Sequence, residues 1–183
     1  VSIFRSFFVF IVLQAGFFFA YAGYEIHELG PAASFWSRGY DINNSGQVAG
    51  ASYFDDSGNE RAAVWGSDFS ILDLGTLGGA KSRAHAINDA GTAVGYSQAQ
   101  GRISAFVYEK GIMTALGTLG GDSGTAWDIN ESGTVAGWSQ TAEGVYNATV
   151  WQNGVAAGLD LLGADYSVAY GVNDNDAVVG VLQ

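Results

Sequence analysis

Hydrophobic residues in this chain fall into short runs that are separated by Gly, Asn, Asp and Ser. Beyond the first 22 residues, no segment shows the 3.6-residue spacing of an amphipathic helix. Short runs rich in Val, Ala, Thr, Trp and Tyr, bounded by turn-forming residues, are typical of β-strands. The pattern therefore predicts an all-β chain of strands of about five to seven residues joined by tight turns.

The same pattern recurs about every 43 residues, and a period of this size indicates a repeat array. Its clearest landmark is an asparagine that ends one apolar run and stands three positions before a glycine. The landmark occurs as Asn43 with Gly46, Asn88 with Gly91, Asn130 with Gly133, and Asn173 with Asp176 in the place of the glycine. Successive asparagines are 45, 42 and 43 residues apart.

Both residues of this landmark suit a hairpin turn. An asparagine side chain hydrogen-bonds the backbone two residues on, which favours the first position of a type I turn. A glycine at the fourth position accepts a positive φ and forms the bulge that follows such a turn. The predicted structural turn residues are Asn43, Gly46, Asn88, Gly91, Asn130, Gly133 and Asn173.

Each full unit continues with two further strands. The third strand ends on an aromatic residue in Ala62–Trp65, Ala105–Tyr108 and Ala148–Trp151, and the unit closes on Leu74–Gly79, Leu116–Gly121 and Leu159–Ala164. Four antiparallel strands in about 43 residues match a β-propeller blade. We predict a propeller-like array of three full and two partial units, with the aromatic residues and closing leucines packed between neighbouring sheets.

Two arrangements of the array are open. Residues 24–30 match the fourth strand of a unit, so this strand can join the last two strands in a hybrid blade and close a small ring. The alternative is a fragment of a longer array. An open array leaves unpaired strand edges, which natural sheets avoid.

The first 22 residues form a separate segment. Arg5 is its only charge, a long apolar run follows, and Ala20-Tyr21-Ala22 provides small residues on either side of a cleavage position. These features predict a signal peptide over 1–22 and a β-repeat domain over 23–183, exported to the periplasm or the extracellular space. An uncleaved membrane anchor is the alternative; after cleavage no membrane span is expected.

Three blocks of the unit resemble the HAF repeat family of bacterial extracellular proteins. They are Ala84–Gly95, Ser104–Tyr108 and Asp73–Gly79, which recur in the order that the family shows. The resemblance implies secretion and a repeat fold, and it carries no catalytic chemistry. No copy keeps the full His-Ala-Phe triplet, because Arg61, Ser104 and Asn147 occupy the histidine position.

Composition limits the possible functions. The formal net charge is −11, so that this surface repels the phosphates of nucleic acids. The chain has no cysteine and two histidines, His27 and His85, which occupy different positions in the unit. It has no nucleophile elbow, Walker loop or HExxH motif. We therefore predict that the protein is not an enzyme.

One metal site is worth considering, for calcium. Two turns fit the opening D-x-N-x-S-G of an oxygen-ligand loop, and the ligands are Asp41, Asn43 and Ser45, and Asp128, Asn130 and Ser132. Against this, the twelfth position is Ser52 or Ser139 in place of a bidentate Glu. No other cofactor is expected.

The function predicted from these features is that of a secreted module that binds a protein or a glycan on one face of the array. Aromatic side chains such as Trp36, Trp127 and Trp138 can stack on sugar rings, although a recurring ring is more often a packing residue. The alternatives are a structural surface component, stabilised by calcium or not, and a propeller-type enzyme with acids gathered at the central channel.

Overall fold

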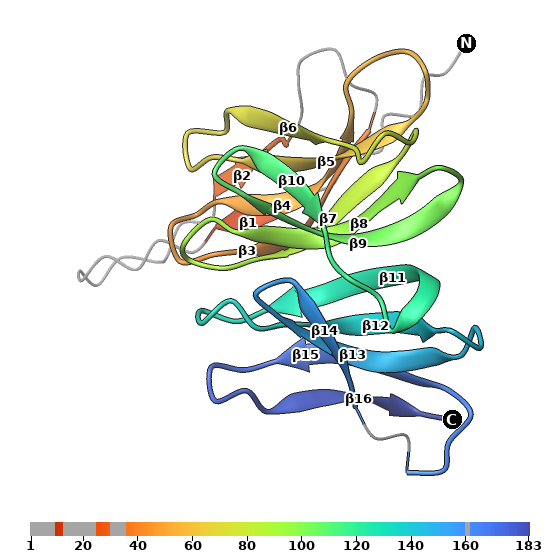
Figure 1. Cartoon of the computed structure of the whole chain (residues 1–183). Coiled ribbons are helices and arrows are strands. Elements are labelled where there is room, and N and C mark those ends of the chain that lie inside the picture. The colour runs from red at the N-terminus through yellow and green to blue at the C-terminus, as the bar shows by residue number, and fades with distance from the viewer. Residues whose placement is uncertain (1–9, 13–24, 30–35, 160–161) are drawn as a thin grey trace.

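The chain folds entirely into β-structure wherever its structure is described. The computed structural model describes residues 10–12, 25–29, 36–159 and 162–183, and these ranges hold sixteen strands and no helix. The paired strands form three four-stranded antiparallel sheets and two two-stranded ones (Figure 1). The predicted all-β repeat of four-stranded antiparallel units is thereby confirmed.

Each four-stranded sheet is one unit, with its strands in chain order. Unit one contains β3 (Ser37–Ile42), β4 (Val48–Tyr53), β5 (Glu60–Trp65) and β6 (Ile71–Gly75). Unit two contains β7 (Ser82–Ile87), β8 (Ala93–Ala99), β9 (Arg102–Glu109) and β10 (Ile112–Ala115). Unit three contains β11 (Gly120–Ile129), β12 (Val135–Thr141), β13 (Tyr146–Gln152) and β14 (Val155–Gly158). Unit four contains β15 (Ser167–Val172) and β16 (Val178–Leu182).

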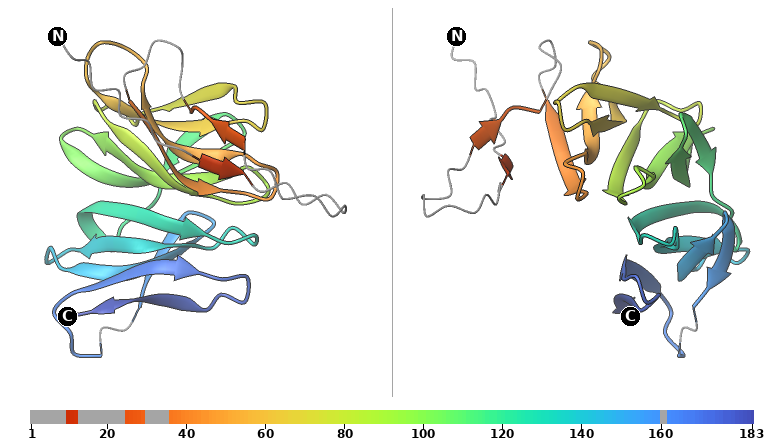
Figure 2. Two further views of the ribbon diagram at one scale, coloured as in Figure 1. Left: turned by 180° about the vertical axis from the view of Figure 1, so that it is seen from behind. Right: turned by 90° about the vertical axis from the view of Figure 1, so that its left-hand side faces the viewer.

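The units follow one another along an open arc (Figure 2). The first strands of successive units, β3, β7, β11 and β15, contact one another in turn. They contact one another more closely than the fourth strands do, so the arc curves with the first strands on its inner side.

The structure does not close the arc into a ring. The N-terminal strand β2 (Glu25–His27) pairs with β1 (Phe10–Val12), whereas β16 has β15 as its one partner among the described strands. Of the two arrangements that the sequence left open, the closed ring with a hybrid blade is therefore wrong. Leu29, which follows β2, packs against the cluster of Val48, Ala63 and Trp65 at the front of unit one. This is where the closing leucine of a preceding unit belongs, as Leu116 lies against Trp151 in unit three.

The core lies between the sheets. Leu74 of unit one packs with Ile87 and Phe106 of unit two, and the closing leucine and third-strand aromatic of the next pair are buried in the same way. Leu74 and Leu116 are each 6% exposed and Trp151 is 1% exposed. The predicted place of the leucines and aromatic residues between neighbouring sheets is confirmed. Each sheet thus depends on its neighbours for burial of its two faces.

The predicted signal peptide falls largely outside this description. Residues 1–9 and 13–22 lie outside the described residues, and 10–12 form β1. Within the described ranges, no helix has the length and apolar character needed to cross a membrane.

Candidate functional site

The asparagine turns have the geometry that their sequence favours. The side-chain Oδ1 of Asn43 accepts hydrogen bonds from the backbone N–H of Ser45 at 3.1 Å and Gln47 at 2.9 Å. Gly46 has a φ of +76°, and its N–H donates to the carbonyl of Asn43 at 3.0 Å. The equivalent fourth residues, Gly91, Gly133 and Asp176, have φ values of +78°, +85° and +58°.

These asparagines also connect the units. The Nδ2 of Asn43 donates to the carbonyl of Asn88 at 2.9 Å, Asn88 donates to Asn130 at 3.1 Å, and Asn130 donates to Asn173 at 2.9 Å. Each amide therefore caps its own turn through oxygen and holds the next turn through nitrogen. We call this series the asparagine ladder. Its first three members are buried and Asn173 is exposed.

The residue after each asparagine forms a second, exposed ladder. Both the backbone N–H and the side-chain amide of Asn44 donate to the carboxylate of Asp89, at 2.7 Å each. The N–H of Asp89 donates to Glu131 at 3.0 Å, and the N–H of Glu131 donates to Asp174 at 3.0 Å. The hydrogen bonds from Asn44 hold the pKa of Asp89 below its usual value. Part of the negative charge of the chain thus serves to join the units.

The residues of the two candidate calcium loops have protein partners. Asp41 accepts from the N–H of Ile87 at 2.9 Å, across the interface between units one and two, and Asp128 accepts from Val172 at 2.8 Å between units three and four. Ser132 donates to Oδ1 of Asn130 at 2.8 Å. The described residues hold no group of three or more His, Cys, Asp or Glu that could bind a metal. These oxygens join and cap the units, and calcium binding stays a prediction.

A β-bulge recurs in every first strand, and it carries an aromatic ring each time. Gly39 pairs with Gly50 and Asp41 with Ala49, so that Tyr40 is the extra residue. The same register shift places His85, Trp127 and Tyr170 at the bulges of units two, three and four. A bulge re-aims its side chain. The four rings form a column along the first strands.

The rings of this column touch from unit to unit. His85 and Trp127 are stacked with 4.3 Å between ring centroids and 8° between planes. Tyr40 meets His85 edge-on at 5.7 Å, and Trp127 meets Tyr170 at 6.0 Å. The facing surfaces of His85 and Trp127 are therefore occupied by each other. At the two ends, Tyr40 and Tyr170 are 37% and 51% exposed.

His85 is the one buried titratable ring of the column. Its Nδ1 lies 2.9 Å from the carbonyl oxygen of Ala126, and since a carbonyl only accepts, Nδ1 carries the proton of a neutral imidazole. Burial lowers the pKa of His85, and the positive charge of Arg83 lowers it further. His85 is therefore neutral at pH 7, where it packs and joins two units as a donor.

Next to His85, the interface between units one and two holds an ion pair. Nε of Arg83 lies 2.6 Å from Oε1 of Glu60, whose side chain is 9% exposed. Tyr96 completes the group, with its ring 5.5 Å from that of His85. Burial raises the pKa of the Tyr96 phenol. This cluster is fully paired and leaves no charge for a ligand.

The interface between units three and four has aromatic residues where the interface between units one and two has the ion pair, with Tyr146 in the position of Glu60. Trp138 and Tyr146 lie with 4.6 Å between ring centroids, and Tyr166 lies 6.1 Å from Tyr146. Partial burial raises the pKa of Tyr166, and Tyr170 beside it raises it further. Tyr146 is 41% exposed and Tyr170 is 51% exposed. We call Trp138, Tyr146, Tyr166 and Tyr170 the aromatic cluster, and it is the candidate functional site.

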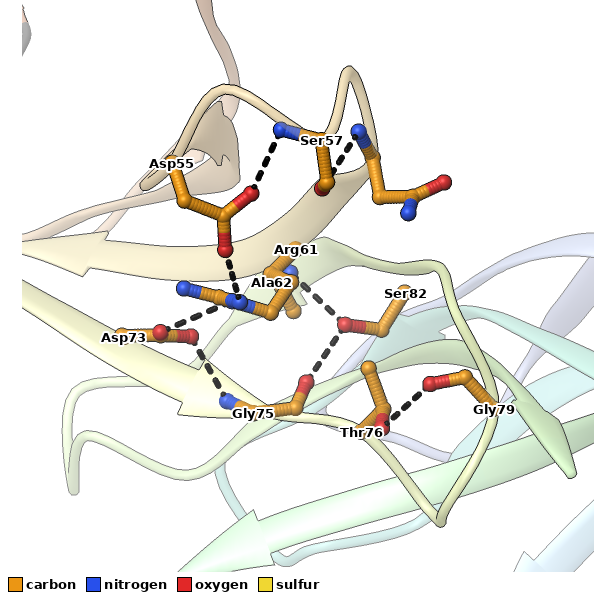
Figure 3. A network of polar contacts seen from close by, with 10 residues as sticks. Asp55, Ser57, Arg61, Ala62, Asp73, Gly75, Thr76, Gly79 and Ser82 are labelled. Carbon is orange, nitrogen blue, oxygen red and sulfur yellow. Dashed lines mark hydrogen bonds and ion pairs between the residues drawn. The ribbon is translucent and has the colours of Figure 1, made fainter. Parts of the chain in front are cut away.

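The links between units use polar contacts that repeat along the chain. Ser82 accepts a hydrogen bond from the N–H of Ala62 at 2.8 Å and donates to the carbonyl of Gly75 at 2.6 Å (Figure 3). Thr76 closes the Leu-Gly-Thr-Leu-Gly-Gly turn by donating to Gly79 at 2.8 Å. Arg61 lies between Asp55 and Asp73, 2.9 Å from each carboxylate (Figure 3). The bonds of Ser82 and Thr76 fix the segment between β6 and β7, which links units one and two.

Sequence reasoning singled out Trp138 but did not group it with the tyrosines. It also singled out Trp127 but did not predict the bulges of the first strands. A signal for them exists, because the second strand carries a glycine opposite every bulge. A Cβ atom at Gly50 would clash with the backbone carbonyl of Arg38, and the other three glycines meet the same obstacle.

Comparison with known proteins adds no relative. No protein-family model and no curated protein matches the chain. The resemblance to the HAF repeat family therefore depends on the three sequence blocks alone.

Proposed function

We propose that this protein is a secreted, non-enzymatic β-repeat module that binds a neutral glycan at the aromatic cluster. The observation that carries the proposal is the group of four Trp and Tyr rings between units three and four, in which Tyr146 and Tyr170 are 41% and 51% exposed. Exposed aromatic groups on a protein surface mark interaction sites. Such rings offer an apolar face for a sugar ring and a hydroxyl or N–H for its hydroxyl groups.

Charge favours a neutral ligand. All seven Lys and Arg residues stand at or before Lys110, so units three and four have no basic side chain. Acidic residues such as Asp165 and Asp174 continue through this part of the chain. An anionic polysaccharide would find no cation here and would be repelled by the net charge of −11.

Secretion is part of the proposal and rests on the sequence of residues 1–22 and on the resemblance to the HAF repeat family. A binding module rather than an enzyme is favoured by the way the polar groups are used. Glu60 is held by Arg83 and His85 donates to Ala126, so that these buried titratable groups have structural partners. The aromatic cluster has exposed surface beyond its internal contacts.

Native gel electrophoresis in the presence of soluble neutral polysaccharides, followed by calorimetry on any that retard the protein, tests this proposal. We expect Tyr146→Ala and Trp138→Ala to abolish retardation while keeping the far-UV circular dichroism spectrum. Phe69→Ala is the matched control, because Phe69 is an aromatic residue of similar exposure, 40%, in unit one. If no neutral glycan binds, or if the cluster variants bind as well as the control, the proposal is wrong.

A further inference from the structure

The surface of unit three that faces unit four carries a polar side chain beside its rings. Trp138 and Gln140 lie two residues apart on β12, so their side chains leave the same side of the strand. On β13, Tyr146 pairs with Gln140 and Ala148 pairs with Trp138, and paired residues share a side. Ala148 lies in one buried cluster with Ala169 of unit four, which shows that this side faces unit four. The amide of Gln140 therefore lies beside two rings of the aromatic cluster.

The hydrogen-bonding groups of this surface are free of protein partners. Among the described residues, neither the indole N–H of Trp138 nor the side-chain amide of Gln140 has a hydrogen-bond partner, and both residues are half-buried. On the opposite side of the sheet, Trp151 donates to the carbonyl of Gly117 at 2.7 Å. A glutamine amide offers one acceptor oxygen and two donor hydrogens. Donors and an acceptor thus remain for a ligand that lies on the rings.

The exposure of these residues is a property of the interface between two units. Gln98 and Ile103 pair with each other in unit two, in the positions that Gln140 and Tyr146 have in unit three. Unit two is followed by a unit with all four strands. Ile103 is nevertheless 39% exposed and Gln98 is half-buried, while Tyr146 is 41% exposed. A complete neighbouring unit therefore leaves this position as open as it is beside unit four.

We propose that Gln140 determines which glycan binds at the aromatic cluster, by hydrogen bonding two neighbouring hydroxyl groups of a sugar that stacks on Tyr146 or Trp138. This inference rests on the proposed function. The amide N–H donates to the oxygen of one hydroxyl group, and the amide oxygen accepts from the other hydroxyl group. Rings select for an apolar face, whereas a hydrogen-bonding group rejects a sugar that lacks its hydroxyl partner.

The groups on this surface also limit the class of sugar. They are an indole N–H, an amide and a phenol, and none of the three carries a formal charge. At the interface between units one and two, the position of Tyr146 is occupied by Glu60, whose charge is matched by Arg83. A sugar acid would find no positive charge beside Gln140 to replace its hydration. The expected ligand is a neutral sugar unit with two adjacent hydroxyl groups that carry no substituent.

Native gels with dextran, galactomannan, xyloglucan and arabinoxylan, all of them neutral polysaccharides, test the role of the amide. Gln140→Leu keeps much of the size of the side chain and removes its hydrogen-bonding groups. Retardation of this variant should need about tenfold more of the polysaccharide that retards wild type. Gln98→Leu is the matched control, because Gln98 has the same place in unit two and pairs with Ile103 in place of a ring. It should behave as wild type.

The outcomes separate this proposal from the proposed function. If Gln140→Leu is retarded like wild type, or if Gln98→Leu is weakened as much, the role of Gln140 is wrong and glycan binding stands. If none of the four polysaccharides retards wild type, both proposals are wrong. Equal melting temperatures of the two glutamine variants would show that a loss of binding is not a loss of folding.

Nuclear magnetic resonance locates the contact. In isotope-labelled chain, the side-chain amide resonance of Gln140 is identified by its absence from the spectrum of Gln140→Leu. An oligosaccharide cut from the retarding polysaccharide should shift this resonance in wild type and leave that of Gln98 in place. A shift at Gln98 in place of Gln140 would overturn the proposal, as would binding without a shift at Gln140.

A set of these oligosaccharides, each lacking one hydroxyl group, identifies what the amide recognises. Loss of either of two adjacent hydroxyl groups should weaken binding to wild type about tenfold and leave binding to Gln140→Leu unchanged. If every member of the set loses the same affinity for both chains, the amide contacts no hydroxyl group of the sugar and the proposal is wrong.

Discussion

The interface between units one and two and the interface between units three and four share a backbone and differ in chemistry. Both are joined by the asparagine ladder, by an aspartate that accepts a backbone N–H, and by a serine that bridges to the third strand. Glu60 and Arg83 form an ion pair at the first interface. The equivalent residues at the second are Tyr146, a member of the aromatic cluster, and Val168.

This difference shows where selection for binding can act in a repeat protein. Contacts that recur in both interfaces support the fold, since every unit needs them to be held to the next. The ion pair matches Glu60, which is buried, with Arg83, whereas the aromatic cluster leaves ring surface exposed. The interface position that differs between the units, with Glu60 at one interface and Tyr146 at the other, is therefore the one at which we expect a ligand to bind.

The largest expected effect comes from breaking the ion pair. Arg83→Val leaves the carboxylate of Glu60 buried without its partner, and should cost about 2–3 kcal/mol of unfolding free energy, less than for a fully buried pair because Arg83 is partly exposed. Glu60→Tyr together with Arg83→Val gives this interface the residues of the other one. The double variant should return to within about 1 kcal/mol of wild type in urea unfolding. A double variant as unstable as Arg83→Val would show that the two interfaces are not interchangeable.

The asparagine ladder should contribute equally to the two interfaces. Asn43→Ala and Asn130→Ala each remove a turn cap and a bond to the next unit, for an expected loss of about 2 kcal/mol. Asn173→Ala removes the cap alone, because no described unit follows, and should cost about 1 kcal/mol. Thermal unfolding of the three variants provides the measurement. A similar loss in all three would mean that the bonds between units add nothing.

The response to pH should distinguish the interface that contains His85. Since burial lowers the pKa of His85 in the folded state, the unfolded chain binds the proton more readily. Stability is therefore full above about pH 6.5 and falls as the pH drops below that value. His85→Phe keeps the ring and should remove this slope between pH 7.5 and 5.5, as measured by urea unfolding. Wild-type stability that stays constant across this range would contradict the assignment.

The smallest effect concerns the middle interface, which lacks the serine bridge. The N–H of Ala62 donates to Ser82 and that of Ala148 donates to Ser167, whereas unit three has Gly124 at this position. Gly124→Ser should let the N–H of Ala105 donate in the same way and raise the free energy of unfolding by about 0.5 kcal/mol. The gain is small because the new Cβ lies only 3.1 Å from the carbonyl of Trp138. A decrease on thermal unfolding would show that this crowding outweighs the hydrogen bond.

The unit itself could be predicted because its signals are local. An Asn-x-x-Gly turn depends on side-chain to backbone bonds within five residues, and alternation of apolar residues fixes which strands form. The bulges were less visible. Each bulge depends on a contact between two strands, because the glycine of the second strand allows the backbone of the first strand to approach. The sequence of either strand taken alone is that of a regular strand.

The aromatic cluster as a whole could not be predicted from local sequence patterns. Trp138 and Tyr146 are diagonal neighbours on the paired strands β12 and β13. Tyr166 comes from the link before β15, and only the stacking of units three and four brings its ring to Tyr146. The same holds for Asp41 and Asp128, which match a calcium loop in sequence. In the fold they face the N–H groups of Ile87 and Val172 more than forty residues away.

The all-β unit, its four strands and the asparagine turns follow from the sequence alone, because they depend on strand propensity and short-range hydrogen bonds. The fold settles that the described units form an open arc, which oxygens accept hydrogen bonds from other units and which rings gather on the surface. These depend on how one sheet stacks on the next, and a repeating sequence presents the same local pattern whether the array closes or stays open.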